Sequence, residues 1–337
     1  MDKKLRVGVV GCGAIGREHI KRITHKIAAA EVVAVTDVFE DSAKKAAALC
    51  GARIEPDSAA LINAADVDAV LVTTPGFAHA EPVLQAVAAG KPVFCEKPLA
   101  TTAADCKRIV DAEVAGGKQL VQVGFMRRYD KGYNQVKELL DSGDFGAPLL
   151  VKCTHRAAGV DDSYTTAMAV TDTAIHEIDV LQWLIGDVWD SAEVIYPRNT
   201  VNAHEGLKDP QLMLLRTKAG VVVALEVFVN CRFGYDINCE VVCEDGVIHM
   251  PAPSWPVVRK NGQLSTKIED NWMRRFIDAY DTEIADWVDA ALRGVVEGPT
   301  AWDGYVAELT ADALVAAQTS GRVEPIVSGE KPAFYGR

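Results

Sequence analysis

Three polar side chains in one apolar segment have a spacing that suits acid–base chemistry. Asp172, His176 and Asp179 are separated by four and three residues. On an α-helix this spacing places the three side chains on similar sides. Histidine exchanges a proton near neutral pH, and a neighbouring carboxylate can orient its ring. A histidine near an aspartate is more often solvated or satisfied in the core than catalytic, so the spacing by itself leaves both interpretations open.

A glycine-rich segment near the start of the chain indicates a second chemistry, the binding of a dinucleotide. An apolar run over residues 7–10 is followed by Gly11-Cys12-Gly13-Ala14-Ile15-Gly16. In this motif the first glycine permits a tight turn, the second lets the backbone approach a pyrophosphate, and the third lets a helix pack against the strand. The amino terminus of that helix offers N–H donors to the phosphate charge.

Asp37 predicts which dinucleotide is bound. It stands 21 residues after Gly16, at the end of the next apolar run, where a carboxylate accepts hydrogen bonds from the ribose hydroxyls of NAD. The same carboxylate repels the 2′-phosphate of NADP, and Val38 and Phe39 bring no positive charge to offset that repulsion. A glycine turn with an incidental acid is the alternative. We therefore expect NAD as the cofactor.

Two further polar segments end apolar runs. Thr73-Thr74-Pro75 ends one run and Glu96-Lys97-Pro98 ends another. Ligands of open parallel sheets bind outside the carboxyl ends of the strands, so both segments point to the same crevice as the glycine motif. Position alone leaves Lys97 open as either a surface charge or a site residue.

The elements that must carry these residues alternate between strand and helix over the first 125 residues. Apolar runs that alternate with helical patterns predict a parallel sheet covered on both faces, an α/β Rossmann domain with a doubly wound sheet. The expected strands are 5–10, 32–36, 69–73, 93–95 and 120–123, and the expected helices are 15–27, 41–49, 78–89 and 103–115.

After residue 125 the pattern changes to β-rich stretches joined by short connections, which suit an antiparallel sheet. Residues 221–229 alternate in a way that predicts one apolar face. We expect a Rossmann domain over residues 1–124 and an α+β domain with an open, mostly antiparallel sheet over residues 125–337. The expected strands are 149–154, 211–216, 221–229, 237–242 and 246–250, and the expected helices are 131–140, 173–184, 273–292 and 301–319.

Composition excludes several classes of protein. The 337 residues carry a formal charge of −12, which disfavours binding to nucleic acid or to an anionic membrane surface. The longest apolar stretch, 221–229, is interrupted by Glu226 and is too short to span a bilayer. Eight cysteines without a C-x-x-C pair suggest reduced thiols in a cytoplasmic protein rather than a disulfide scaffold or a metal site.

Several segments together resemble the Gfo/Idh/MocA oxidoreductases, and the similarity covers the whole chain. The glycine motif, Cys95-Glu96-Lys97-Pro98 and His176-Glu177-Ile178-Asp179 resemble the family as a whole. Other segments resemble the branch of this family that oxidises inositols. They are residues 125–130, 153–156, 171–179, 298–304 and 331–335.

The resemblance implies oxidation of myo-inositol to 2-keto-myo-inositol by hydride transfer to NAD. His176 would be the general base that takes the hydroxyl proton. Lys97 would donate a hydrogen bond to the reacting hydroxyl and stabilise its alkoxide. Asp172 would hold Lys97 or a substrate hydroxyl in place. The resemblance also implies a cis bond between Lys97 and Pro98, and a homotetramer formed by pairing of the open sheets.

The remaining site residues follow from the same resemblance. A small polyol needs many polar partners, and none of them needs to be a metal. The substrate-binding candidates beside Lys97, Asp172 and His176 are Arg127, His155, Asp179 and Tyr235. The cofactor-binding candidates are Gly11, Cys12, Gly13, Ala14, Ile15, Gly16, Asp37, Val38, Thr73, Thr74, Pro75, His79, Glu96 and Lys97.

Two alternative functions remain open at this point. A dehydrogenase of the same branch acting on scyllo-inositol, another inositol isomer or a pyranose sugar would share these residues. A noncatalytic NAD-sensing regulator would need the glycine motif but neither Lys97 nor His176. The presence of both residues favours an enzyme.

Replacing Asp37 by serine is expected to relax the preference for NAD over NADP, because the carboxylate that repels the 2′-phosphate is removed. The ratio of kcat/KM for the two cofactors, measured by initial rates, checks this. Unchanged discrimination in the variant would contradict the assignment.

Overall fold

The computed structural model describes residues 4–253 and 255–336, which form two compact units. The first unit comprises Met1–Met126, Tyr280–Leu309 and Ser328–Arg337, and the second comprises Arg127–Ala279 and Thr310–Val327. This grouping differs from the expected division at residue 125, because later segments return to the first unit. The return leaves no signal in the sequence, since an apolar helix face looks the same whichever sheet it packs against.

The first unit contains a six-stranded sheet in which every pair of neighbouring strands is parallel. The strand order is β3-β2-β1-β4-β5-β6, so the order reverses between β1 and β4. This is the doubly wound arrangement expected from the sequence, and it is confirmed. The strands are β1 (Leu5–Val10), β2 (Ala30–Thr36), β3 (Arg53–Ile54), β4 (Ala69–Val72), β5 (Val93–Glu96) and β6 (Val121–Gly124).

Helices connect these strands, and side chains cap the first N–H groups of two of them, α3 and α5. Asp57 accepts a hydrogen bond from Ala60, and Thr102 accepts one from Asp105, as helix-capping residues do. The short elements β3 and α3 were absent from the expected series because each spans too few residues to show a periodicity. The helices are α1 (Ala14–Lys26), α2 (Glu40–Cys50), α3 (Ser58–Asn63), α4 (Ala80–Ala88) and α5 (Ala103–Gly116), with the 3₁₀ turns η1 (Gly76–Ala78) and η4 (Ala333–Tyr335).

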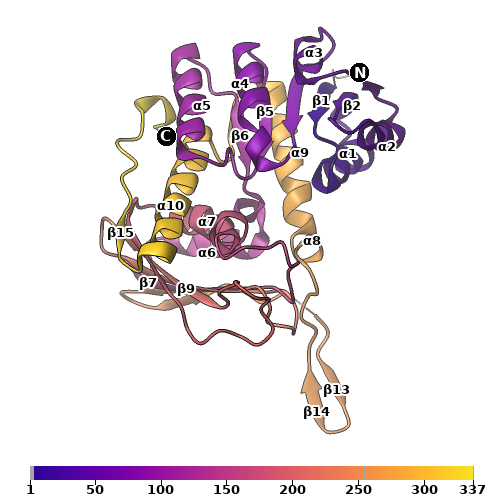
Figure 1. Ribbon diagram of the computed structural model, residues 1–337. Helices are drawn as coiled ribbons and strands as arrows, with labels where there is room; N and C mark the ends of the chain where they lie inside the picture. Colours follow the sequence, from indigo (N-terminus) through magenta and orange to yellow (C-terminus); the bar gives the residue numbers. More distant parts are fainter. Residues whose placement is uncertain (1–3, 254, 337) are drawn as a thin grey trace. The chain divides into compact units, whose positions relative to one another are not determined.

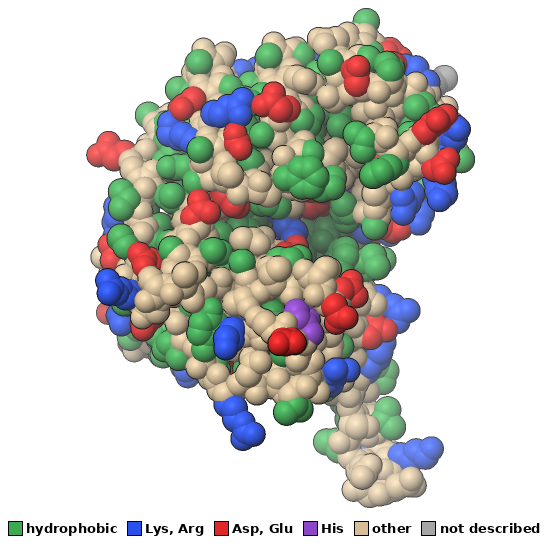
Figure 2. Space-filling model, viewed as in Figure 1, with side chains coloured by type: hydrophobic (Ala, Val, Ile, Leu, Met, Phe, Trp, Pro, Cys, Tyr) green, Lys and Arg blue, Asp and Glu red, His purple; other side chains and the backbone are tan. Residues whose placement is uncertain are grey.

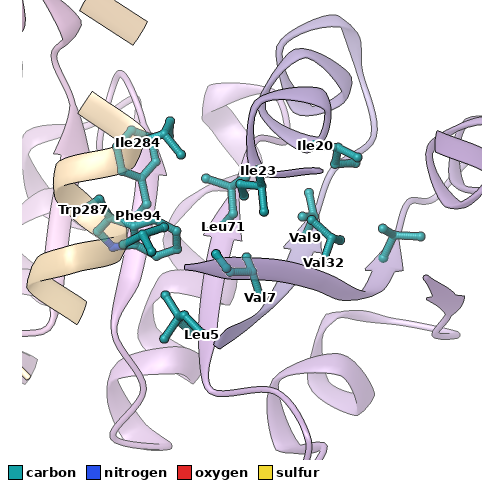
Figure 3. Close-up of a cluster of buried hydrophobic side chains, with 14 of the residues drawn as sticks. Leu5, Val7, Val9, Ile20, Ile23, Val32, Leu71, Phe94, Ile284 and Trp287 are labelled. Atoms are coloured by element: carbon teal, nitrogen blue, oxygen red, sulfur yellow. The ribbon is translucent and has the colours of Figure 1, made fainter. Parts of the chain in front are cut away.

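A late helix completes the hydrophobic core of the first unit. Helix α9 (Ile277–Arg293) brings Ile284 and Trp287 into the cluster formed by strand residues such as Val7 and Phe94 (Figure 3). The Trp287 and Phe94 rings meet edge to face, with centroids 5.6 Å apart. Burial of large apolar side chains against the sheet explains why this distant segment belongs to the first unit.

The second unit is built on a seven-stranded sheet with helices α6 (Lys131–Asp141) and α7 (Ile175–Ile185) over one face (Figure 1). Its order is β12-β11-β7-β10-β9-β8-β15, and only the β7–β10 pair is parallel. The expected mostly antiparallel sheet is confirmed. Its strands are β7 (Pro148–Arg156), β8 (Trp189–Ile195), β9 (Gln211–Thr217), β10 (Val222–Phe228), β11 (Asp236–Cys243), β12 (Val247–His249) and β15 (Glu324–Pro325).

Strand β10 shows the alternation that the sequence predicts. Val223, Leu225 and Val227 are buried, whereas Ala224 and Glu226 between them are partly exposed on the opposite face. The alternation arises because successive side chains of a strand point to opposite faces of the sheet. Other elements of this unit are the turn η2 (Met126–Tyr129), the segment η3 (Ala169–Ala174), the hairpin strands β13 (Val258–Lys260) and β14 (Gln263–Ser265), and helix α8 (Trp272–Arg275); helix α10 (Ala301–Ser320) is divided between the two units.

The visible surface carries acidic and basic side chains in scattered positions rather than in one large patch of a single sign (Figure 2). Among residues 4–253 and 255–336, no helix is long and apolar enough to cross a membrane. The same described residues contain no group of three or more His, Cys, Asp or Glu side chains that could hold a metal ion.

Replacing Trp287 by alanine is expected to lower the free energy of unfolding by about 3–5 kcal/mol, because it leaves a large cavity in the core of the first unit. Urea unfolding of the variant and the parent protein measures the loss. Leu292→Ala in the same helix, at a side chain that is 41% exposed, serves as the control and should change it much less. Equal losses in the two variants would contradict this account of α9.

Candidate active site

The glycine turn after β1 lies against the segment after β4 with no room for a side chain. Gly11 has a φ of +97°, and a Cβ atom placed there would lie 2.4 Å from the backbone nitrogen of Thr74. A Cβ atom on Gly16 would lie 2.3 Å from the carbonyl oxygen of Gly11. The Thr73 hydroxyl donates a hydrogen bond of 2.6 Å to that same carbonyl. These contacts explain the first and third glycines of the motif.

Gly13 has a different environment, which fits a bound phosphate. It is the N-cap of α1, it is exposed, and a Cβ atom placed on it would have no protein atom within 4 Å. Helix α1 has no side-chain cap and no acidic residue in its first turn, so its amino end can receive an anion. The exposed Ala14 and half-buried Ile15 continue this surface. The turn therefore fits the pyrophosphate of a dinucleotide.

Asp37 is oriented by two backbone donors. Its Oδ2 accepts a hydrogen bond of 2.6 Å from the N–H of Cys12, and its Oδ1 accepts one of 2.8 Å from the N–H of Phe39. A carboxylate has about four acceptor sites, so these bonds leave capacity for ribose hydroxyls. The next side chain, Val38, is 94% exposed and carries no charge. The Cys12 side chain is buried, and burial raises the pKa of its thiol to about 12.

The segments after β4 and β5 are joined by a buried histidine. Nδ1 of His79 lies 2.6 Å from the carbonyl oxygen of Pro98, and its Nε2 lies 2.7 Å from the carbonyl oxygen of Thr74. Burial lowers the pKa of His79, although the two carbonyl contacts oppose that shift. His79 thus acts through its contacts with the two loops, whereas Pro75 beside Thr74 is exposed.

Lys97 follows the last residue of β5, at the same end of the sheet as the glycine turn. The Lys97–Pro98 peptide bond is cis, so that expectation is confirmed. Lys97 is half-buried, whereas Glu96 is buried and uses its carboxylate within the protein. Glu96 Oε2 accepts a hydrogen bond of 3.1 Å from the N–H of Lys97, and its Oε1 lies 2.7 Å from Nε2 of His19.

In the second unit, the helix that carries His176 begins later than expected. A regular helix was expected from residue 173, but residues Ala169–Ala174 form a π-helical turn and α7 begins at Ile175. The N–H of Ile175 bonds to the carbonyl of Val170, five residues back. The four-residue spacing of Asp172 and His176 therefore does not place them on one face of a regular α-helix. Asp172 is exposed, and His176 is 9% exposed. Such π-turns are frequent at functional sites.

Asp179 is engaged by a residue that the sequence argument did not assign. Arg128 donates to both of its carboxylate oxygens, from Nε at 2.9 Å and from Nη2 at 2.5 Å. A two-point contact of this kind fixes both side chains more firmly than a single bond. The arginine was visible in the Arg127-Arg128-Tyr129 segment, but nothing in the sequence showed which of the two arginines faces Asp179.

Three predicted substrate-binding residues meet in one buried network. His155 Nε2 lies 3.1 Å from the hydroxyl of Tyr235, and Arg127 Nη2 lies 3.2 Å from His155 Nδ1. Glu177 joins them, because it forms an ion pair with Arg127 and its Oε2 lies 2.9 Å from His155 Nδ1. Phe276 covers the guanidinium of Arg127 at 5.2 Å. The sequence analysis did not assign Glu177 to the site. A glutamate within an apolar helix was the one feature of the sequence that could have indicated it.

The network determines where protons lie. A carboxylate only accepts hydrogen bonds, so the shorter of the two Nδ1 contacts, with Glu177, favours the Nδ1–H form of His155. Arg127 Nη2 then donates to the Tyr235 hydroxyl at 3.4 Å rather than to Nδ1, and His155 Nε2 accepts from Tyr235. Burial raises the pKa of Tyr235, although the charge of Arg127 opposes that shift, so the phenol stays protonated and can donate. Arg127 and Glu177 are almost fully buried, and their opposite charges offset each other's desolvation.

The candidate residues thus form two groups, each gathered within its own unit. Lys97 and the cofactor-binding candidates lie at the carboxyl ends of the parallel strands in the first unit. Asp172, His176 and the network around Glu177 belong to the second unit. A glycine turn that fits a phosphate, a strand-end carboxylate with acceptor capacity left and a strand-end lysine are typical of a dinucleotide-dependent oxidoreductase of the Rossmann type.

Comparison with known proteins identifies the family. Residues 5–125 match the Gfo/Idh/MocA model described as an oxidoreductase family with an NAD-binding Rossmann fold. Residues 137–326 match the model of the C-terminal alpha/beta domain of the same family. The chain belongs to the Gfo/Idh/MocA oxidoreductases, as the sequence predicted, and NAD is the cofactor of its Rossmann domain.

Individual relatives match over their whole length. The chain is 55% identical to the inositol 2-dehydrogenase of Azotobacter vinelandii over 333 residues, covering 98% of each chain. It is 51% identical to that of Klebsiella pneumoniae, covering 99% of each. The structure of myo-inositol dehydrogenase from Lactobacillus casei, in complex with NAD(H) and myo-inositol, has a TM-score of 0.97 at 43% identity, covering 98% of this chain and 99% of that chain. Scyllo-inositol dehydrogenase of the same species, with NAD(H) and scyllo-inositol, has a TM-score of 0.87 at 25% identity, covering 96% and 99%.

Replacing Glu177 by glutamine is expected to lower the free energy of unfolding by about 3–5 kcal/mol, because it leaves the buried charge of Arg127 uncompensated. Urea unfolding measures the change. Asp141→Asn, which breaks the exposed Lys137–Asp141 pair, is the matched control and should cost less than about 1 kcal/mol. Similar losses in the two variants would show that the buried pair contributes no more to the free energy of unfolding than the exposed pair.

Proposed function

We propose that this chain oxidises myo-inositol to 2-keto-myo-inositol and reduces NAD to NADH. The observation that carries the proposal is similarity along the whole chain to enzymes named inositol 2-dehydrogenase, at 51–55% identity. The fit of the glycine turn and Asp37 to a dinucleotide supports it from the side of the cofactor. The likeness to a solved complex with NAD(H) and myo-inositol supports it from the side of the substrate.

Residues of the first unit would hold NAD. The open surface at Gly13 and the amino end of α1 would receive the pyrophosphate, and Asp37 would accept hydrogen bonds from the adenosine ribose. Bound NAD supplies the acceptor for a hydride, at C4 of its nicotinamide ring. The Thr73, Thr74 and His79 contacts would keep the rim of this site in place.

His176 would act as the general base. Oxidation of a secondary alcohol requires loss of the hydroxyl proton as the hydride leaves the carbon. An imidazole needs no large pKa shift to accept that proton near neutral pH. His176 is largely buried, which suits a group that exchanges its proton with a bound substrate rather than with bulk water.

Lys97 would stabilise the oxygen that loses its proton, because an ammonium group favours the developing alkoxide over the neutral hydroxyl. Asp172, exposed in the π-turn, would hold Lys97 or a hydroxyl of the substrate.

The polyol would be recognised by Arg127, His155, Asp179 and Tyr235. These groups bind one another, Glu177 or Arg128, so contacts within the protein set their orientation. A carboxylate such as Asp179 can accept further hydrogen bonds beside those from Arg128. A hydroxyl of the wrong stereochemistry would leave one of these buried groups without its partner, which is a strong basis for discrimination.

The open face of the second sheet supports assembly into a homotetramer. A hollow of about 410 Å³ on this sheet is lined by Leu212, Ala224 and Met250 together with charged residues. The charges are already paired across strands, Lys152 with Glu240 and Arg156 with Glu226. Pairing within the face lowers the cost of covering it with a second copy. A cytoplasmic location remains a prediction, in keeping with the free thiols of all eight cysteines.

Initial rates with myo-inositol, scyllo-inositol, chiro-inositol and glucose, each with NAD and with NADP, test this function. We expect the highest kcat/KM for myo-inositol with NAD, measured as the appearance of NADH absorbance. A higher value for another substrate would assign the chain to that substrate. Absence of turnover with all four, together with intact NAD binding, would favour a sensing role.

Replacing His176 by alanine tests the mechanism within the same assay. Loss of a general base is expected to lower kcat/KM by about 10²–10⁴-fold while NADH binding persists. His25→Ala, at an exposed histidine of α1, is the matched control and should retain parental activity. Near-normal turnover by the His176 variant would remove this residue from the role of base.

A further inference from the structure

A buried ionisable pair lies beneath the strand end that carries Lys97. Nε2 of His19, in the second turn of α1, lies 2.7 Å from Oε1 of Glu96, the last residue of β5. His19 is 0% exposed and Glu96 is 6% exposed. Burying an ionisable ring and a carboxylate away from water costs desolvation free energy unless hydrogen bonds or opposite charges compensate each group.

The carboxylate of Glu96 connects this pair to Lys97. Its second oxygen, Oε2, accepts the backbone N–H of Lys97 at 3.1 Å. A Cβ atom on Gly124 of the neighbouring strand would lie 3.1 Å from the same oxygen, so the carboxylate has little freedom on that side. One carboxylate therefore joins a helix side chain to the main chain of the proposed catalytic lysine.

Arg22 and Glu96 contact the two ring nitrogens of His19. Nη1 of Arg22 lies 3.5 Å from Nδ1 of His19, and a guanidinium nitrogen can only donate. The Glu96 carboxylate, 2.7 Å from Nε2, can only accept, so Nε2 carries the ring proton and donates it to Glu96, which leaves Nδ1 able to accept from Arg22. Glu96 in turn accepts from both His19 and Lys97, the arrangement that suits an ionised carboxylate.

The guanidinium is itself held in place from the other side. Nε of Arg22 donates to Oδ1 of Asp281 at 3.0 Å, and Lys26 pairs with the other oxygen of that carboxylate. The guanidinium also lies over the ring of Tyr280, 5.1 Å from its centroid. All of these residues belong to the first unit. The series Asp281–Arg22–His19–Glu96–Lys97 is thus a continuous set of polar contacts.

We propose that His19 is a positioning residue for Lys97. By donating to Glu96, it fixes the carboxylate that holds the Lys97 backbone, and it does so from the helix whose amino end receives the cofactor phosphates. The inference rests on the proposed catalytic role of Lys97. It assigns Glu96 a role in orienting the lysine rather than in touching the cofactor.

Ordinary core packing does not account for this arrangement. A neutral apolar pair of the same size would fill the space under β5 without the cost of burying a carboxylate. The carboxylate is instead directed at a single main-chain N–H, that of the residue proposed to stabilise the alkoxide. Small displacements of such a group, on the order of 1 Å, can cost about 100-fold in rate.

Two amide variants of His19 test whether the hydrogen bond donated to Glu96 or the imidazole ring itself is required. His19→Gln can place its side-chain NH₂ near the position of Nε2 and still donate to Glu96. His19→Asn is one methylene shorter and cannot reach that carboxylate. We expect kcat/KM for inositol to fall by about 10- to 100-fold in His19→Asn and by less than about fivefold in His19→Gln. His25→Asn, in the exposed part of the same helix, is the control and should match the parent.

Two measurements distinguish positioning from general damage. With inositol deuterated at the reacting carbon, the primary isotope effect on kcat/KM should rise in His19→Asn, because hydride transfer becomes slower. The dissociation constant for NADH should stay within about threefold, since the glycine turn is not altered. Should His19→Asn not fold, His19→Ala, which also removes the donor to Glu96, replaces it in the same comparison with the same expectation.

Chemical labelling tests the inference without any turnover. Competitive acetylation with acetic anhydride, read by mass spectrometry, compares the rate at Lys97 with that at the exposed Lys45. We expect this ratio to shift by about threefold or more in His19→Asn and to stay at the parental value in His19→Gln, because the surroundings of the Lys97 ammonium change only in the former.

The outcomes separate this inference from the proposed function. If the parent enzyme oxidises none of the inositols, the proposed function fails, and the labelling ratio still decides whether His19 positions Lys97. If the parent is active but His19→Asn matches it in both rate and labelling, the inference about His19 is overturned while the proposed function stands. Equal losses in His19→Asn and His19→Gln would also overturn it, since the donated hydrogen bond would then not matter.

Discussion

The first unit depends on the close approach of two backbone segments, the glycine turn after β1 and the residues after β4. No side chain fits between Gly11 and Thr74, or between Gly16 and the Gly11 carbonyl. This contact sets where α1 begins and therefore where its amino end lies. Because α1 also carries His19, the same helix contacts Glu96 at the end of β5, and Glu96 accepts the backbone N–H of Lys97. The close packing at Gly11 and Gly16 therefore sets the positions of both the cofactor turn and the helix that contacts the strand end next to Lys97.

The second unit, built on the mostly antiparallel sheet, contains a pair of buried charges that must be stabilised. Arg127 and Glu177 are almost completely buried, and their charges are tolerable only because they lie together with His155 and Tyr235 as hydrogen-bonding neighbours. Such a network resists rearrangement, because moving one member leaves another unsatisfied. A polyol site gains from this rigidity, since ring hydroxyls of different stereochemistry differ only in the direction of their bonds.

The sequence predicted much of this because its signals are local. The glycine motif, the strand-end Asp37 and the alternation of residues 221–229 each report on a few neighbouring residues, and all three have the expected structure. The expectation for Asp172 and His176 was wrong about the helix, since a π-turn precedes α7 and changes the register between them. A single extra residue in a turn depends on the packing around it, so periodicity could not show it.

By itself, the sequence determined the two kinds of sheet, the dinucleotide turn and the family. Those properties follow from patterns read within one segment at a time. Only the tertiary structure decided the partners of the polar groups: Arg128 with Asp179, Glu177 with Arg127 and His155, and His19 with Glu96. It also decided that α9 returns to the first unit. Which residues distant in the chain become partners depends on burial and on the need to satisfy each buried charge. Local patterns in the sequence show neither of these.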